Sequence, residues 1–217
     1  MSHFIVNSYV YGSTIPELEL IDNDFSMEFN GTDEYISAGN DSSLNITDNL
    51  SVSAWIKTTD NTSQTIVNKD QPGVTRIWQL SMGLGTISFQ ARGASTATAN
   101  SPTNLSDGVW HHVVGTYEPS TEVKIYIDGV LAATDNTSVP ASLTNDATIP
   151  IYIGAYSNYS GSEYAGDIDE VAIWNKTLEL AEIETIYDST NDNPGKCANL
   201  FTGGLGTDLV FWNRMGD

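Results

Sequence analysis

The sequence is poor in cysteine. Its 217 residues contain a single cysteine, Cys197, so an intrachain disulfide is excluded. A chain of this length can bury a core that needs no covalent cross-links, and the count is therefore compatible with either an oxidising or a reducing compartment. We expect Cys197 to be a free thiol, with pairing to another chain as the alternative.

Basic residues are also scarce. Lysine and arginine together number 8, against 28 aspartates and glutamates, which gives a formal net charge of −20. This charge repels phosphate backbones and anionic membrane surfaces, so nucleic acid is not an expected partner. The excess of carboxylates has two explanations: solubility, or ligands for a hard cation such as Ca²⁺.

Long apolar runs are missing as well. No stretch is long enough to span a bilayer, so membrane insertion is not expected. The first residues, MSHFIVNSYVYGSTIPELEL, lack the basic start and apolar stretch of a signal peptide. We expect a protein that is extracellular, on the cell surface or associated with a virion, exported by a removed leader or another route.

The sequence does contain many short apolar runs separated by Gly, Asn, Asp, Ser or Pro. In the run 51–56, Val52, Ala54 and Ile56 face one way, whereas Trp55 shares the other face with two serines. This spacing is typical of an all-β sandwich and predicts two antiparallel sheets packed face to face. Because of Trp55, we expect this strand to have apolar contacts on both sides.

One helix is predicted near the C-terminal end of the sandwich. Leu180, Ile183 and Tyr187 recur at spacings of three and four residues, and two glutamates suit the helix N-terminus. We expect this short helix to plug one open end of the sandwich.

The organisation expected along the chain is one domain with two extensions. Residues 1–24 form an N-terminal extension, residues 25–188 the sandwich, and residues 189–217 a polar linker with an apolar tail. The tail contains the apolar run 209–212, which either docks on the sandwich, pairs with another copy in a homo-oligomer, or belongs to a longer protein.

Three segments carry a resemblance to a known family. They are MEFNGTDEYISAG at 27–39, DGVWHHVVGTYEPSTEVKIYIDGV at 107–130 and GDIDEVAIWNKTLELAEI at 166–183. Together they resemble the laminin-G-like jelly-roll domains of the concanavalin-A-like lectin/glucanase superfamily, over about residues 25–188. The resemblance implies a jelly roll with a short helix after the last core strand.

Signals for catalysis are weak. In the glucanase branch of the resembled superfamily, alternating acids on one strand point into one cleft, but here Asp167 and Asp169 share a face that Glu170 does not. His111 and His112 are neighbours on a strand that is structural in the family, and they point to opposite faces. We do not expect an enzyme, and glycoside hydrolysis ranks third among the functions considered.

The resemblance also implies a structural Ca²⁺ ion that joins the first and last core strands. Asp169 would be the main ligand, with Asn30 and the Gly31 carbonyl opposite it, and with Asp33 and Asp167 in reserve. Many family members have aspartate where this chain has Asn30, and the lost charge would weaken the site. The alternative is that Asp169 forms hydrogen bonds in a turn.

Aromatic, amide and arginine side chains predict a recognition surface. The loop AYSNYSGSEYAG and a neighbouring region supply Tyr156, Asn158, Tyr159, Tyr164, Arg76, Trp78 and Arg92. Aromatic faces with polar partners suit sugar rings, and Tyr, Asn, Ser and Gly also compose adaptable protein-binding loops. Packing in the core is the alternative role for Trp78.

The function expected from these features is a non-catalytic recognition module, stabilised by Ca²⁺, that binds a glycan or a surface protein through loops at one rim. The alternative is a structural, assembly or surface-adhesion component, for example of a virus particle or a fibre.

Overall fold

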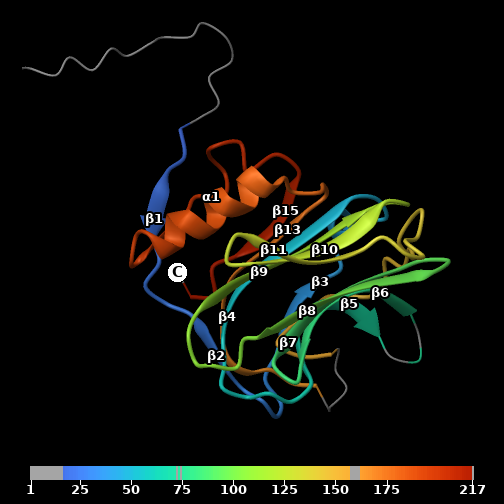
Figure 1. Cartoon of the computed structure of the whole chain (residues 1–217), viewed down its shortest axis with the longest axis horizontal. Coiled ribbons are helices and arrows are strands. Elements are labelled where there is room, and N and C mark those ends of the chain that lie inside the picture. The colour runs from blue at the N-terminus through green and yellow to red at the C-terminus, as the bar shows by residue number, and fades with distance from the viewer. Residues whose placement is uncertain (1–16, 72, 74, 157–161, 217) are drawn as a thin grey trace, which may run out of the picture.

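A computed structural model of the chain describes residues 17–71, 73, 75–156 and 162–216. In this part of the chain, two antiparallel sheets pack face to face and one α-helix lies against one of them (Figure 1). The predicted all-β jelly-roll sandwich with one short helix is therefore confirmed. Among the described residues, no helix is long and apolar enough to cross a membrane.

The larger sheet has seven strands. Its main path runs, in spatial order, through β11 (Val130–Asp135), β10 (Glu122–Ile127), β9 (His111–Glu118), β4 (Leu50–Lys57), β13 (Ala165–Trp174) and β15 (Leu209–Asn213). The seventh strand, β2 (Met27–Asn30), pairs with the first half of β13, whereas β15 pairs with the second half. The long strand β13 therefore has β4 along one edge and both β2 and β15 along the other.

The second sheet has six strands. Their spatial order is β3 (Ile36–Gly39), β12 (Ile151–Ile153), β5 (Gln64–Gln71), β6 (Thr75–Gly83), β7 (Thr86–Arg92) and β8 (Thr96–Asn104). The remaining elements are a short pair made of β1 (Leu20–Asp22) and β14 (Lys196–Ala198), the 3-10 helix η1 (Ser42–Leu44) and the helix α1 (Leu180–Asn191).

The main core fills the space between the two sheets. Val52, Ala54 and Ile56 of β4 point into it, as their alternation predicts, and are fully buried. Phe89 reaches the core from β7 and lies against Gly115 of β9, where an added Cβ atom would lie 2.3 Å from the ring. Glycine at 115 thus allows the two sheets to approach closely.

Helix α1 covers a face of the sandwich. Ile183 and Ile186 pack against Val114, Ala172 and Trp174, which point outward from the seven-stranded sheet. The expectation that the helix plugs an open end is therefore wrong, because outward apolar residues on β9 and β13 need cover. The apolar contacts expected on both sides of β4 are confirmed, since Trp55 and its neighbouring serines are buried too.

The C-terminal apolar run is paired within the chain. Residues of β15 form ladder pairs with β13, and the Trp212 indole N–H donates to Oε2 of Glu170 at 2.6 Å. The guanidinium of Arg214 lies 3.3 Å from Oε1 of the same carboxylate. Residues 189–217 therefore contribute two strands, β14 and β15, to the folded unit.

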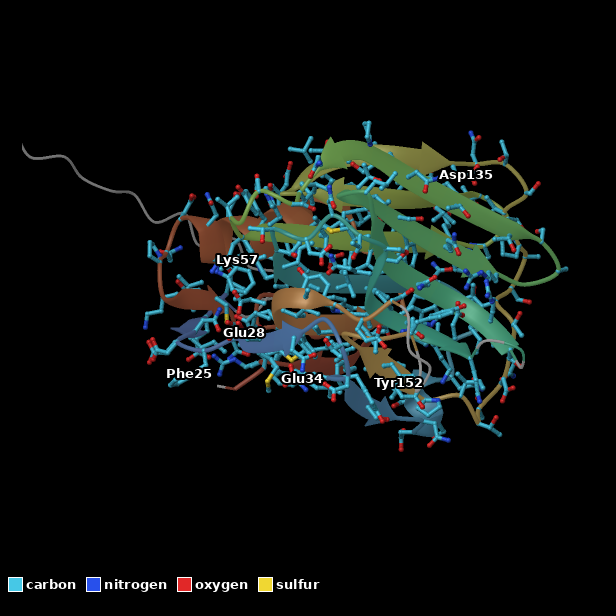
Figure 2. The ribbon with its side chains drawn as sticks, turned by 90° about the horizontal axis from the view of Figure 1, so that it is seen from below. Phe25, Glu28, Glu34, Lys57, Asp135 and Tyr152 are labelled. Carbon is cyan, nitrogen blue, oxygen red and sulfur yellow. The ribbon has the colours of Figure 1, made fainter. Side chains whose placement is uncertain are left out.

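The long axis of the molecule separates two regions of its surface. Figure 2 shows Phe25 and Lys57 toward one end of this axis, and Tyr152 and Asp135 toward the other. Lys57 and Asp135 both belong to strands of the seven-stranded sheet, whereas Tyr152 belongs to the six-stranded sheet. The seven-stranded sheet therefore extends along the long axis of the molecule.

Candidate functional site

The outer face of the six-stranded sheet carries two rows of uncharged polar side chains. Core residues such as Leu80 and Phe89 alternate with half-buried polar residues along the strands, so the polar side chains point away from the core. We call these residues the polar face: Gln79 and Ser81 of β6, Ser88 and Gln90 of β7, and Thr98 and Asn100 of β8.

Strand register aligns the polar face into rows. Gln90 lies directly opposite Gln79 on one side and Thr98 on the other. Ser88 lies in the same way between Ser81 and Asn100. Side chains that are directly opposite on neighbouring strands are about 5 Å apart at Cβ, so each row is a continuous line of hydrogen-bonding groups. Helix α1 packs on the other sheet, so the one α-helix of the described residues does not cover this face (Figure 1).

A charged corner adjoins the polar face. It consists of Asp70, Arg76, Arg92 and Tyr156. The Arg92 guanidinium donates to Oδ2 of Asp70 and to the side-chain oxygen of Gln90. Burial raises the pKa of Asp70, and the positive charge of Arg92 opposes that rise.

Tyr156 and Arg76 complete the corner. Arg76 lies opposite Asp70 on the neighbouring strand, and its guanidinium carbon is 5.6 Å from the centroid of the Tyr156 ring. Burial raises the pKa of Tyr156. The structure therefore brings together three of the residues predicted for recognition, namely Tyr156, Arg76 and Arg92, around a carboxylate that the sequence reasoning did not include.

Two other predicted recognition residues lie in the core instead. Trp78 is fully buried, because it shares the inward face of β6 with Leu80 and Met82. Tyr164 is also fully buried, packs edge-on against Phe29 with ring centroids 6.4 Å apart, and has a pKa raised by burial. Both are core residues, which corrects the prediction that they contact a ligand.

Two predicted recognition residues, Asn158 and Tyr159, lie outside the described residues. A tyrosine pair that the sequence reasoning missed borders the same sheet face. Tyr35 and Tyr152 meet edge-on with ring centroids 5.7 Å apart, and Tyr152 lies opposite Asn68 on β5. The alternation Ile151-Tyr152-Ile153 was the signal that could have identified Tyr152 as outward-facing.

The predicted calcium ligands are not brought together. In the strand register Asn30 lies opposite Ala165, whereas Asp169 lies opposite Trp55, four residues further along β13. Four residues of strand span about 13 Å, which is too far for one ion to bridge. The donor set expected from the resemblance, with Asn30 and Gly31 facing Asp169, does not fit this geometry.

The oxygens of these residues have other partners. Asn30 Oδ1 accepts from the backbone N–H groups of Thr32 and Asp33, and Asn30 Nδ2 donates to Asp33 Oδ1 at 2.8 Å. Asp167 is ion-paired with Lys57 at 3.3 Å. Within the described part of the chain, no group of three or more His, Cys, Asp or Glu side chains is arranged to hold a metal ion.

Asp169 has a different setting from the one predicted. Its Oδ2 accepts from the Asn23 side-chain amide at 3.0 Å, and its Oδ1 accepts from the Glu170 backbone N–H at 2.8 Å. Glu170 has a positive φ of 49° where the register between β13 and β4 shifts. This bulge turns Glu170 toward β15, and Asp169 lines a pocket on the outer face of the seven-stranded sheet.

Comparisons with known proteins agree with the architecture. The family model described as the concanavalin A-like lectin/glucanases superfamily matches residues 30–184. No curated protein matches the chain.

Several solved structures share the fold. A protein from Bacteroides ovatus, described as a candidate carbohydrate-binding protein, aligns with a TM-score of 0.68 and 15% identity over 91% of this chain and 53% of its own length. This chain therefore spans about half of that protein.

Two further structures align over most of both chains. The heptameric SAP-like pentraxin of Limulus polyphemus has a TM-score of 0.59 and 16% identity, covering 81% of this chain and 84% of its own. Domain 4 of an extracellular arabinanase from Geobacillus stearothermophilus was solved with arabinotriose. It aligns with a TM-score of 0.59 and 20% identity, over 80% of this chain and 81% of its own length. At these identities the likenesses establish the fold.

Proposed function

The chain belongs to the concanavalin A-like lectin/glucanase superfamily, and on that basis we propose that it is a non-catalytic module that binds glycans across its polar face. The observation that carries the proposal is the alignment of Gln79, Gln90 and Thr98, beside the row of Ser81, Ser88 and Asn100, on the sheet that α1 does not cover.

The chemistry of these rows suits sugar hydroxyls. Each hydroxyl of a glycan can donate and accept. Gln79 donates one side-chain N–H to Thr65, and the Gln90 oxygen accepts from Arg92. The other donors and acceptors of these amides can pair with hydroxyls. The rows stand on strands of a packed sheet, so binding costs little backbone entropy. Tyr152 and Tyr156 at the borders provide ring faces against which a sugar can pack.

The lack of charge on the polar face itself favours a neutral glycan. The side chains of the polar face carry no formal charge, and the adjoining Arg92 is paired with Asp70. A free anionic or cationic ligand would therefore find no uncompensated partner among the residues of the polar face. The overall charge of −20 further disfavours an anionic polysaccharide.

The carboxylates do not suit hydrolysis. Glycosidases use two carboxylates that flank the scissile bond. The polar face has none, and the charged corner has one, Asp70, which is buried and ion-paired. Elsewhere, Glu170 is held by Trp212 and Arg214, and the Asp169 carboxylate accepts from Asn23 and from the Glu170 backbone N–H. These contacts support a binding role.

We further propose an extracellular location, since domain 4 of the arabinanase belongs to an extracellular enzyme. Stabilisation by Ca²⁺, self-association through the C-terminal tail and a role in a virion or an adhesion surface stay predictions.

The proposal is tested by screening the labelled chain against an array of neutral glycans. We expect binding to one class, lost in the double variant Gln79→Ala/Gln90→Ala and kept in Thr134→Ala, an exposed threonine on β11 of the other sheet. Thermal unfolding of each variant checks that the fold is retained. An array on which the wild-type chain binds nothing, or on which the double variant binds equally, contradicts the proposal.

A further inference from the structure

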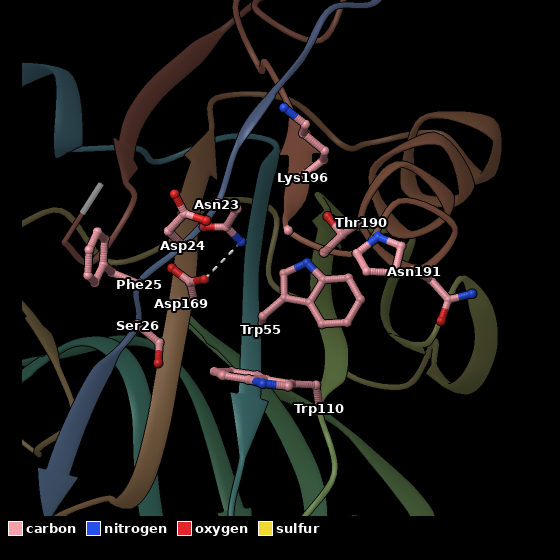
Figure 3. A pocket seen from close by; sticks show the side chains of 12 residues that line it. Asn23, Asp24, Phe25, Ser26, Trp55, Trp110, Asp169, Thr190, Asn191 and Lys196 are labelled. Carbon is pink, nitrogen blue, oxygen red and sulfur yellow. Dashed lines mark hydrogen bonds between the residues drawn. The ribbon is translucent and has the colours of Figure 1, made fainter.

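A pocket of about 400 Å³ lies on the outer face of the seven-stranded sheet, away from the polar face. Its walls come from β4 and β13, from residues 23–26 after β1, from the end of α1 and from residues 194–196 (Figure 3). The walls at 23–26 and 190–196 lie outside residues 30–184, which are the residues that the family model matches.

Two tryptophans give the pocket its aromatic surfaces. Trp55 lies opposite Asp169 in the strand register and is fixed by stacking on His112 and Tyr187, with ring centroids 5.2 Å and 5.8 Å away. Trp110 is 37% exposed and offers an open ring beside it. Figure 3 shows the two indoles next to each other, with Asp169 facing them from β13.

Three residues that line the pocket each have a buried polar atom with no hydrogen-bond partner within the described part of the chain. The atoms are Oδ1 of Asn23, Nε1 of Trp55 and Oγ1 of Thr190. Leaving a buried polar atom unpaired costs about 1–3 kcal/mol, and native structures contain few of them. These atoms, one acceptor, one N–H donor and one hydroxyl, have almost no accessible surface, so a ligand in the pocket reaches them only when neighbouring side chains shift.

The carboxylate beside them is held in place. Asn23 donates its side-chain N–H to Asp169, and this bond orients the amide and its Oδ1 within the pocket wall. The backbone N–H of Glu170 fixes the other oxygen of Asp169. The polar groups are therefore preorganised, which lowers the entropic cost of binding.

The charges around the pocket disfavour an anion, and they disfavour a cation over the Trp110 ring. Carboxylates of Asp24 and Asp169 line it, and so does Lys196, which is ion-paired with Asp22. The ammonium of Lys57 lies 5.8 Å from the centroid of the Trp110 ring, which disfavours a second cation over the same ring. Carboxylates in turn disfavour an anion.

From these observations we propose that the pocket binds one sugar ring of a neutral glycan, stacked on Trp110. Small shifts of the pocket side chains on binding expose three buried atoms, so that the ring's hydroxyls donate to Asn23 Oδ1, accept from Trp55 Nε1–H and exchange a hydrogen bond with Thr190. This site is separate from the polar face and does not depend on glycan binding there. Its volume lies within the range of about 300–1,000 Å³ that is usual for small-ligand sites.

Indole NMR of the whole chain tests the proposal directly. The protein has 5 tryptophans, so ¹⁵N labelling gives one indole N–H signal for each, assigned with Trp→Phe variants. The probes are methyl glycosides of glucose, galactose, mannose, xylose, arabinose and N-acetylglucosamine. We expect one of them to shift the signals of Trp55 and Trp110 with a common saturation curve, while the buried Trp78 and Trp174 stay in place.

Two variants separate binding from folding. Trp110→Ala removes an exposed ring, and Thr190→Val removes only a hydroxyl, and each is expected to weaken binding about tenfold, equivalent to about 1.4 kcal/mol. Thr185→Val, also on α1 but not lining the pocket, is the control and should bind as the wild type does.

The two sites can be told apart in the same experiment. Gln79→Ala/Gln90→Ala should leave the Trp55 shift unchanged, because the polar face belongs to the other sheet. The proposal is overturned if no glycoside shifts the Trp55 signal at its highest soluble concentration. Equal affinities in Trp110→Ala, Thr190→Val and the wild type overturn it as well.

Discussion

The guanidinium of Arg92 is paired with the fully buried carboxylate of Asp70 at the edge of the polar face. Asp70 Oδ1 also accepts from the backbone N–H of Ile77, so both carboxylate oxygens have partners. This arrangement fixes the β5–β6 end of the sheet and orients Arg92 toward Gln90. The pair therefore connects the stability of the sheet to the shape of the proposed glycan site.

Arg92→Met should destabilise the protein by about 3–5 kcal/mol at pH 7, because it leaves a buried carboxylate without its cation. Urea unfolding measures the loss. Arg76→Met, on the neighbouring strand but exposed, should lose much less, since exposed ion pairs contribute little. Equal losses in the two variants would show that the Arg92–Asp70 pair has no special role.

The deficit of Arg92→Met should also depend on pH. Burial already raises the pKa of Asp70, and removing the opposing arginine raises it further. A carboxyl group whose pKa is higher in the folded protein than in the unfolded chain favours folding when it is protonated, at pH values below its unfolded pKa. This contribution is lost as the pH rises through the pKa of the folded protein. Unfolding at pH 3 should therefore show a smaller deficit than at pH 7, and a constant deficit contradicts this reasoning.

His112 should contribute to acid unfolding. Burial lowers its pKa from 6.5 to about 3, so the folded protein keeps the ring neutral while the unfolded chain protonates it. The stability present above pH 6.5 is lost as the pH falls toward 3. His112→Gln should flatten the dependence of the unfolding free energy on pH by about 1.4 kcal/mol per unit in this window. Parallel curves for variant and wild type would argue against a buried neutral ring.

Gly115→Ala tests the close approach of the sheets. The new Cβ would lie 2.3 Å from the Phe89 ring, so overpacking should cost about 1–3 kcal/mol or more. Gly83→Ala is the matched control, because a Cβ there meets nothing within 4 Å. Thermal and urea unfolding compare the two, and equal stabilities would indicate that the sheets can separate at no cost.

Asp169→Asn should leave any difference between the melting temperatures in Ca²⁺ and in EDTA unchanged. The carboxylate is already hydrogen-bonded to Asn23 and Glu170 and lies apart from Asn30. Asp33→Asn, beside Asn30, is the comparison. If Ca²⁺ raises the melting temperature of the wild type and of Asp33→Asn but not of Asp169→Asn, the result would support Asp169 as a calcium ligand, as the resemblance implies.

The fold was predictable because its signals are local. The alternation of Val52, Ala54 and Ile56 and the helical spacing of Leu180, Ile183 and Tyr187 correspond to β4 and α1. The position of α1 was not predictable in this way. It depends on outward apolar residues of strands that are distant in sequence, which only the sheet register brings together.

The site was predictable only in part. Tyr156, Arg76 and Arg92 were identified from composition, and they meet around Asp70. Trp78 and Tyr164 are residues of the same types, yet both lie in the core. Trp78 is on the inward face of its strand, and Tyr164 packs against Phe29. The alignment of the polar face depends on the order of β6, β7 and β8 and on their register, which no single segment encodes.

The most direct test of glycan binding at the polar face is a backbone NMR titration of the wild-type chain with the glycan selected on the array. We predict saturable shifts of the amide signals of β6, β7 and β8, centred on Gln79 and Gln90. Saturable shifts that leave these strands untouched and fall elsewhere on the molecule would contradict the assignment of the polar face as the glycan site.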